Sequence, residues 1–185
     1  MKDQPLATLQ TEFRAGSTAS MPIAGAIVWA ALGAAALVLD DGTVGTLALY
    51  IMAAIMPLAI LLDRVQGRNL FAGGADNPLT VLFLTSVTGI ALMVPIGVIA
   101  AQATGSGVLM VLTMAILAGV IWIPYGWAAD DPAGLRHAVG RALGAYAAYA
   151  LVPAPYTASG ICAVVVAAYG YSLVAMRPVG TAVPA

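Results

Sequence analysis

Long apolar stretches separated by short polar breaks dominate the sequence. A hydrocarbon core about 30 Å thick is crossed by roughly 20 apolar residues in helical form, and six stretches come near that length. They cover residues 21–39, 44–62, 78–101, 108–128, 132–152 and 157–176. We therefore predict an all-α polytopic membrane protein, with six transmembrane helices in one bundle over residues 20–177.

The segments outside this bundle are short. In residues 1–19, Leu6, Leu9 and Phe13 recur near helical spacing. This pattern fits either a short helix in the headgroup plane or a frayed tail, both on the cytoplasmic side. Residues 178–185, which follow the last apolar stretch, are predicted to be a disordered tail.

Basic residues predict the orientation of the bundle. They lie before the first stretch, between the second and third, around the start of the fifth and after the sixth, and the other three connections contain none. The seven are Lys2, Arg14, Arg64, Arg68, Arg136, Arg141 and Arg177. Because Lys and Arg concentrate in cytoplasmic loops, both termini are predicted to be cytoplasmic. We expect a multi-pass protein of the bacterial inner membrane, surrounded by the lipid bilayer.

Prolines interrupt three of the predicted spans, at Pro57, Pro95 and Pro124. Each proline lacks a backbone N–H and leaves the carbonyl four residues earlier without its usual partner. The fourth helix is therefore predicted to bend between Val120 and Pro124.

Composition and charge narrow the function classes. The chain is 62% hydrophobic and 8% charged, with a net charge of -1, and its mean hydropathy is +0.97. Without a basic tract, we expect no nucleic-acid partner. With Cys162 as the one cysteine, no intrachain disulfide can form.

No set of residues typical of catalysis is evident. The single histidine, His137, lies among arginines at a predicted helix start and is interpreted as a solvated side chain, whereas Cys162 is interpreted as a packing residue. No acidic residue falls within an apolar stretch. We predict that the protein is not an enzyme, with no catalytic residues, no metal site and no cofactor. Because the apolar stretches contain no Asp or Glu, we also predict no titrating carboxylate within the membrane.

The densest unusual segment is Trp122-Ile123-Pro124-Tyr125-Gly126-Trp127. One interpretation is an aromatic belt at the headgroup level. The other places Trp122 and Tyr125 inside the bundle with Tyr146 or Tyr149, around a small, mainly apolar cavity open to the cytoplasm. Such a cavity would suit a neutral or aromatic small molecule.

Arg141 is the deepest charge in the predicted bundle, about nine residues into the fifth helix. The favoured interpretation is that its side chain snorkels to the headgroups. The alternatives are contact with an anion or headgroup, or an ion pair with Asp63 or Asp130. Gly140 and Gly144 flank it with the spacing that allows close helix approach. Arg141 completes the predicted ligand-binding set with Trp122, Tyr125, Tyr146 and Tyr149.

Two short segments resemble each other. Ala24-Gly25 with Trp29 in the first stretch is similar to Ala118-Gly119 with Trp122 in the fourth. Because the two helices would run in opposite directions, an inverted repeat is one explanation; chance is the other, in a chain rich in alanine and glycine.

Several positions together resemble the YoaS-like family of small uncharacterised bacterial integral membrane proteins. They are Trp29, Pro57-Leu58, Leu61-Leu62, Asn77-Pro78-Leu79, Pro124-Tyr125 and Trp127, and the resemblance extends over residues 12–176. It implies a multi-helix membrane protein and transfers no site or activity.

In size and span number the chain is also similar to the substrate-binding subunits of energy-coupling-factor vitamin transporters, which dock through small residues of the first helix. Ala26, Ala30 and Ala34 would suit such docking. We expect a small-molecule binding or transport component. The alternative is an accessory protein that binds another membrane protein, or a second copy of itself, through a small-residue helix face.

Overall fold

The computed structural model of the chain describes residues 4–67 and 76–176. Within these ranges all regular secondary structure is helical, which confirms the predicted all-α class. The predicted disordered tail at residues 178–185 lies outside the described residues.

The helices coincide closely with the apolar stretches of the sequence. In chain order they are α1 (Leu6–Gly16), α2 (Ser20–Ala35), α3 (Asp41–Val65), α4 (Pro78–Ala91), α5 (Val94–Thr104), α6 (Gly107–Val120), α7 (Trp122–Ala128), α8 (Ala133–Leu151) and α9 (Thr157–Ala175). The third stretch is divided into α4 and α5, and the fourth into α6 and α7.

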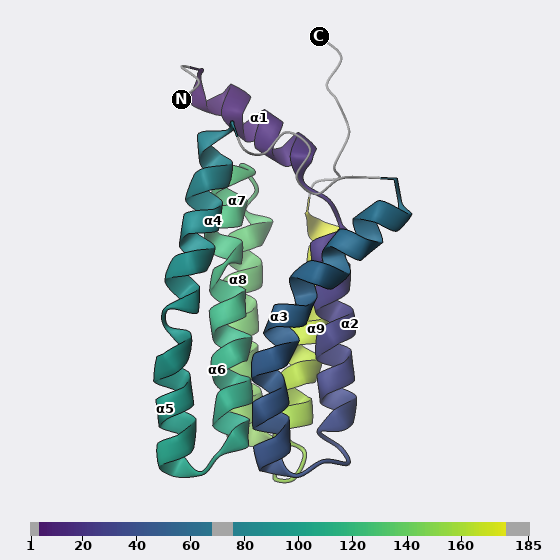
Figure 1. Cartoon of the computed structure of the whole chain (residues 1–185), viewed down its shortest axis with the longest axis vertical. Helices are drawn as coiled ribbons and strands as arrows, with labels where there is room; N and C mark the ends of the chain where they lie inside the picture. Colours follow the sequence, from purple (N-terminus) through teal and green to yellow (C-terminus); the bar gives the residue numbers. More distant parts are fainter. Residues whose placement is uncertain (1–3, 68–75, 177–185) are drawn as a thin grey trace.

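The long helices stand side by side along the long axis of the molecule, and α1 lies across one end (Figure 1). α9 packs against α2, α8 and α6, while α6 also contacts α3 and α5. The connections α2–α3, α5–α6 and α8–α9 lie together at the end opposite α1. This arrangement puts α6 and α9 at the centre of the bundle.

Several of these helices are long and apolar enough to cross a membrane. Four stretches meet this description: Asp41–Val65, Pro78–Thr104, Gly107–Ala128 and Thr157–Ala175. α1 and α2 would add a fifth if the pair, which is bent by 52°, forms one span. The structure therefore supports a helical membrane bundle. α8 is not among these candidates.

Two of the three predicted proline interruptions divide a helix. α4 ends at Ala91 and α5 begins at Val94, directly before Pro95. α6 ends at Val120 and α7 begins two residues later, so the helix is interrupted where the bend before Pro124 was predicted. In contrast, α3 continues through Pro57. The missing N–H of proline therefore coincides with a division at Pro95 and Pro124 but not at Pro57. The sequence around Pro57 gives no sign of this difference.

α1 is a docked helix, so the frayed-tail alternative is wrong. Leu9 and Phe13 pack with Leu79 of α4 and Ala128 of α7. The Asn77 side chain accepts the Leu79 N–H at 2.9 Å and donates to the Leu9 carbonyl at 2.8 Å. One asparagine therefore caps α4 and holds α1 across the end of the bundle.

At the opposite end, Asp40 caps α3. Its carboxylate accepts from the Thr43 hydroxyl at 2.6 Å and from the Thr43 N–H at 2.9 Å. These two hydrogen bonds lower the pKa of Asp40 below its ordinary value.

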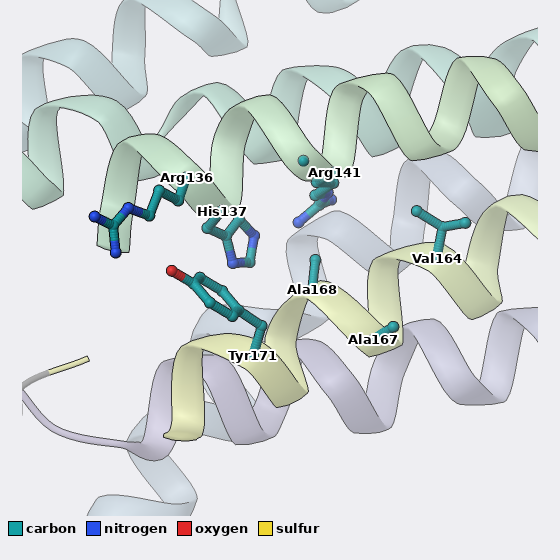
Figure 2. A pocket seen from close by; sticks show the side chains of 8 residues that line it. Arg136, His137, Arg141, Val164, Ala167, Ala168 and Tyr171 are labelled. Atoms are coloured by element: carbon teal, nitrogen blue, oxygen red, sulfur yellow. The ribbon is translucent and has the colours of Figure 1, made fainter. Parts of the chain in front are cut away.

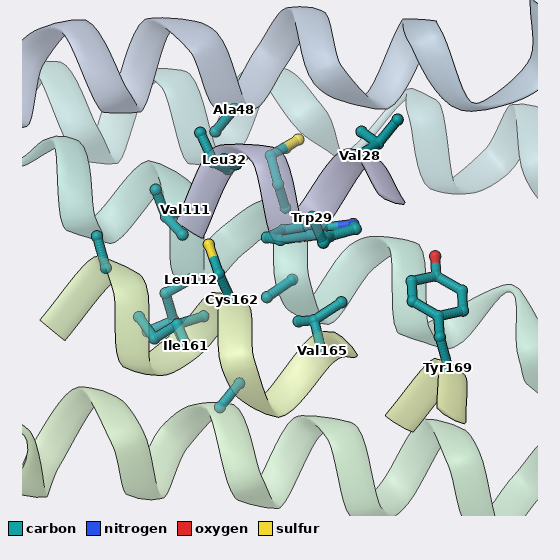
Figure 3. Packing of buried hydrophobic residues seen from close by; sticks show 14 of the residues in the cluster. Val28, Trp29, Leu32, Ala48, Val111, Leu112, Ile161, Cys162, Val165 and Tyr169 are labelled. Atoms are coloured by element: carbon teal, nitrogen blue, oxygen red, sulfur yellow. The ribbon is translucent and has the colours of Figure 1, made fainter. Parts of the chain in front are cut away.

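The apolar core lies where α2, α6 and α9 meet (Figure 3). Trp29, Leu32, Val111 and Ile161 have no exposed surface. Cys162 is 1% exposed among them, as its interpretation as a packing residue requires. This core positions the polar side chains that α8 contributes.

Candidate functional site

Arg141 of α8 points into the centre of the bundle, and its side chain has no exposed surface. Its Nε donates to the Ala115 carbonyl of α6 at 2.7 Å. The guanidinium carbon lies 5.3 Å from the centroid of the Trp29 ring and 5.2 Å from that of Tyr169. The snorkelling interpretation is therefore wrong, because the side chain turns away from both the lipid face and the headgroups.

Two glycines make room for this arrangement. A Cβ at Gly119 would lie 3.1 Å from Cδ of Arg141, and a Cβ at Gly25 would lie 2.7 Å from the Tyr169 hydroxyl oxygen. Any larger residue on α6 or α2 at these positions would displace the side chains that surround the guanidinium.

His137, one turn before Arg141, is also buried and not solvated as predicted: 1% of its surface is exposed. Its Nδ1 lies 2.5 Å from the Ser172 hydroxyl oxygen of α9. Its ring stacks on Trp122, with centroids 4.5 Å apart, and meets Tyr169 edge-on at 5.4 Å. We call Trp29, Trp122, His137, Arg141, Tyr169 and Ser172 the polar core cluster.

The polar core cluster is not electrically balanced. Neither terminal nitrogen of the Arg141 guanidinium, nor Nε2 of His137, has a hydrogen-bond partner among the residues that the structure describes. Aromatic faces attract a desolvated cation by about 2 kcal/mol. The effective cost of burying an unpaired ion is several kcal/mol. Among the residues that the structure describes, the guanidinium is thus a buried cation without an acidic partner.

The proposed ion pair of Arg141 with Asp63 or Asp130 is not formed. Asp63 is fully buried, but its carboxylate accepts from the Ser20 hydroxyl at 2.5 Å and the Thr18 hydroxyl at 3.2 Å. Asp130 is exposed in the turn before α8. A carboxylate buried at the end of α3 therefore belongs to the junction of α1 and α2, away from the guanidinium.

A cavity of about 440 Å³ lies beside the polar core cluster, between α8 and α9 (Figure 2). Its lining residues are Arg136, His137, Gly140, Arg141, Val164, Ala167, Ala168 and Tyr171. Within the described ranges, the lining contains two arginines and one histidine but no acidic residue.

The Gly140 and Gly144 pair has two different roles in this region. A Cβ at Gly144 would lie 2.7 Å from a methyl carbon of Val164, so this glycine allows α9 to approach α8. A Cβ at Gly140 would meet no atom within 4 Å, and Gly140 lines the cavity. Close helix approach therefore explains only one of the pair.

Of the five predicted ligand-binding residues, Trp122 and Arg141 belong to the polar core cluster, and among the described residues that line the cavity only Arg141 is one of the five. Trp122 is 7% exposed and contacts Tyr125, with ring centroids 5.3 Å apart. Through His137 it joins the same cluster as Arg141. Tyr146 and Tyr149 are 53% and 44% exposed on α8 and lie outside both the cluster and the cavity lining.

Sequence reasoning missed Trp29 and Ser172 as members of the polar core cluster. A signal existed for one of them, because Gly25 with Trp29 is similar to Gly119 with Trp122. Both segments contact the polar core cluster. The glycines lie beside Tyr169 and Arg141, respectively, and the tryptophans lie beside Arg141 and His137. Ser172 lies in an apolar helix without any distinguishing pattern.

Comparison with known proteins gives one result. No curated protein and no solved structure matches the chain. Residues 6–177 match a family of unknown function, DUF7010. This match supports the expectation of an uncharacterised family but not the YoaS-like name. The chain belongs to the DUF7010 family.

Proposed function

We propose that this protein is a small-molecule binding or transport component of the bacterial inner membrane, with its ligand site at the polar core cluster and the adjoining cavity. The observation that carries the proposal is the buried Arg141 guanidinium without a counter-charge. Natural bundles rarely keep an uncompensated charge at membrane depth unless it acts on a substrate, ion or proton.

The proposal includes six spans with both termini cytoplasmic. α8 is less apolar than the other candidates because Arg136, His137 and Arg141 occupy its first turns. Two of these face the bundle interior, where low hydropathy is compatible with a membrane helix. α8 also packs along α9 and α6 as the other long helices pack on one another.

Reporter fusions test this topology. Fusions after Asp41, Gly105 and Ala154 are expected to behave as periplasmic, because those connections lie at the end without Lys or Arg. Fusions after Pro132 and at the C-terminus should behave as cytoplasmic. A periplasmic C-terminus would contradict the six-span arrangement and indicate that α8 does not cross.

We further propose that the ligand carries a negative charge, in place of the neutral or aromatic ligand suggested by the aromatic residues alone. An anion near the polar core cluster would supply the counter-charge that Arg141 lacks. The aromatic rings around the cation offset only part of the cost of burying it, so a counter-charge would still be favourable. Because the described residues of the cavity lining include no acidic side chain, no carboxylate among them would repel an anion.

A binding screen tests the charge of the ligand. Purified protein in nanodiscs of zwitterionic lipid is unfolded thermally with acetate, benzoate, octanoate, phosphate and matched uncharged compounds. At 100 times its Kd, a binding anion is expected to stabilise the protein by about 2.7 kcal/mol. Arg141→Gln should remove this effect. Arg64→Gln, which removes an exposed charge from α3, should preserve it.

The alternative, an accessory protein that binds another membrane protein, is favoured by one observation. Ala30 and Ala34 are exposed on α2 and Ala26 is half-buried, so a small-residue face is available for a partner helix. The same screen separates the two functions. The accessory function predicts no stabilisation by any anion.

A further inference from the structure

The cavity between α8 and α9 opens sideways. Gly140, Ala167 and Tyr171 line it and are exposed at the surface of the bundle. α8 and α9 both stand along the long axis of the molecule (Figure 1), and the exposed lining residues lie within these two helices, so the cavity opens on the side of the bundle. In a membrane-spanning bundle this flank is in contact with lipid.

The two ends of the cavity differ in chemistry. Figure 2 shows Tyr171 of α9 extending toward Arg136 and His137 of α8, at one end. At the other end lie Val164 and Ala167, which offer only apolar surface. The cationic end is the one nearer the start of α8, hence nearer the end of the bundle that carries α1.

Charge along this cavity has one sign. Arg136 is exposed and can contact a ligand directly, and the Tyr171 hydroxyl can donate to it. Arg141 forms part of the wall, but its two terminal nitrogens are buried behind it. In a low-dielectric interior that unpaired charge still acts over several ångströms. The geometry therefore suits a negative group at one end and an apolar chain at the other.

We propose that the ligand is a single-chain anionic amphiphile that enters from the lipid phase. Its carboxylate or phosphate group lies at the Arg136 end, within the field of Arg141, and its apolar chain lies along Gly140, Val164 and Ala167. This inference rests on the proposed function, because it names the class of anion that the site binds and the route by which it arrives.

Four probes separate the contributions of head and tail. Radiolabelled octanoate, octanol, acetate and inorganic phosphate are equilibrated with the full-length protein in zwitterionic-lipid nanodiscs, and binding to empty nanodiscs is subtracted. Octanoate is expected to bind at least about tenfold more tightly than either acetate or octanol, since it alone has both a charge and a chain to bury. Arg141→Gln should reduce this preference over octanol, whereas Arg64→Gln should not.

A substitution at Gly140 tests the position of the chain. Gly140→Leu fills the cavity from an open position and is expected to weaken octanoate binding at least about tenfold. The matched control is Gly170→Leu on α9, where a Cβ also meets no atom within 4 Å but the cavity lining is not involved. Its octanoate binding should equal that of the unaltered protein.

The outcomes distinguish this inference from the proposed function. The amphiphile proposal would be overturned if acetate, phosphate and octanoate bound equally, or if Gly140→Leu left octanoate binding unchanged. The site would then be one for water-soluble anions. Tight binding of octanol with no loss in Arg141→Gln would overturn the role of charge. Failure of all four probes to bind would overturn both proposals.

Discussion

Arg141→Met is expected to leave the free energy of unfolding unchanged or to raise it by about 1–4 kcal/mol, and to abolish anion binding. Replacing a buried ion pair with apolar residues of similar size is often neutral or stabilising by this amount, because the desolvation penalty disappears. An unpaired buried charge has less favourable interaction to lose, so the same outcome is expected here. Arg141 contributes one hydrogen bond, to the Ala115 carbonyl within α6. That carbonyl lies inside a helix, where the backbone N–H four residues later donates to it, so it keeps a hydrogen-bond partner when Arg141 is replaced.

The measurement is unfolding by denaturant or heat in nanodiscs, together with anion binding. Arg64→Met, at an exposed position, provides the control for loss of one positive charge and should change the free energy by no more than about 0.5 kcal/mol. Destabilisation of Arg141→Met by several kcal/mol would show that the guanidinium maintains the fold. In that case its burial could no longer support a ligand site.

Gly134→Ala is expected to destabilise the bundle by about 1–3 kcal/mol, the usual cost of overpacking. A Cβ there would contact the carbonyl oxygen of Trp122 and would lie 2.6 Å from the Gly126 Cα. Both obstacles are backbone atoms, which cannot rotate away as a flexible side chain can. α7 and α8 would have to separate, and the stacking of His137 on Trp122 would be lost with them.

Gly140→Ala, six residues further along α8, is the matched control. Its Cβ meets no atom within 4 Å, so it should raise the free energy of unfolding by up to about 1 kcal/mol through helix propensity alone. The two variants are compared by thermal unfolding under identical conditions. Equal effects at the two positions would contradict the close contact between α7 and α8.

Much of the helical layout was predictable because each helix boundary depends on local chemistry. The cap at Asn77 followed by Pro78, and Asp131 before α8, whose carboxylate accepts the Ala133 N–H, are signals contained in a few consecutive residues. The division of the fourth stretch before Pro124 agrees with the missing N–H of proline, although α3 continues through Pro57 with the same defect. The hydrophobic pattern thus predicts where helices lie and end.

The candidate site was less predictable because it depends on which face of each helix turns inward. Arg141 and Tyr146 lie on the same helix, yet one has no exposed surface and the other is 53% exposed. A membrane sequence gives little indication of this choice, since its outer face is as apolar as its core. The neighbours of Arg141 come from α2, α6 and α9, distant segments that the fold alone brings together.

The unpaired charge of Arg141 has an electrical consequence for any transport cycle built on it. Moving one elementary charge across a potential of 100 mV changes the free energy by about 2.3 kcal/mol. With a monovalent anion bound, the charge of Arg141 would be offset, and the membrane voltage would do little work on this pair. Without the anion, the buried charge of Arg141 is not offset, so a negative interior would draw it toward the cytoplasmic side. The resting voltage would then act on the return of the unloaded site and not on the passage of the anion.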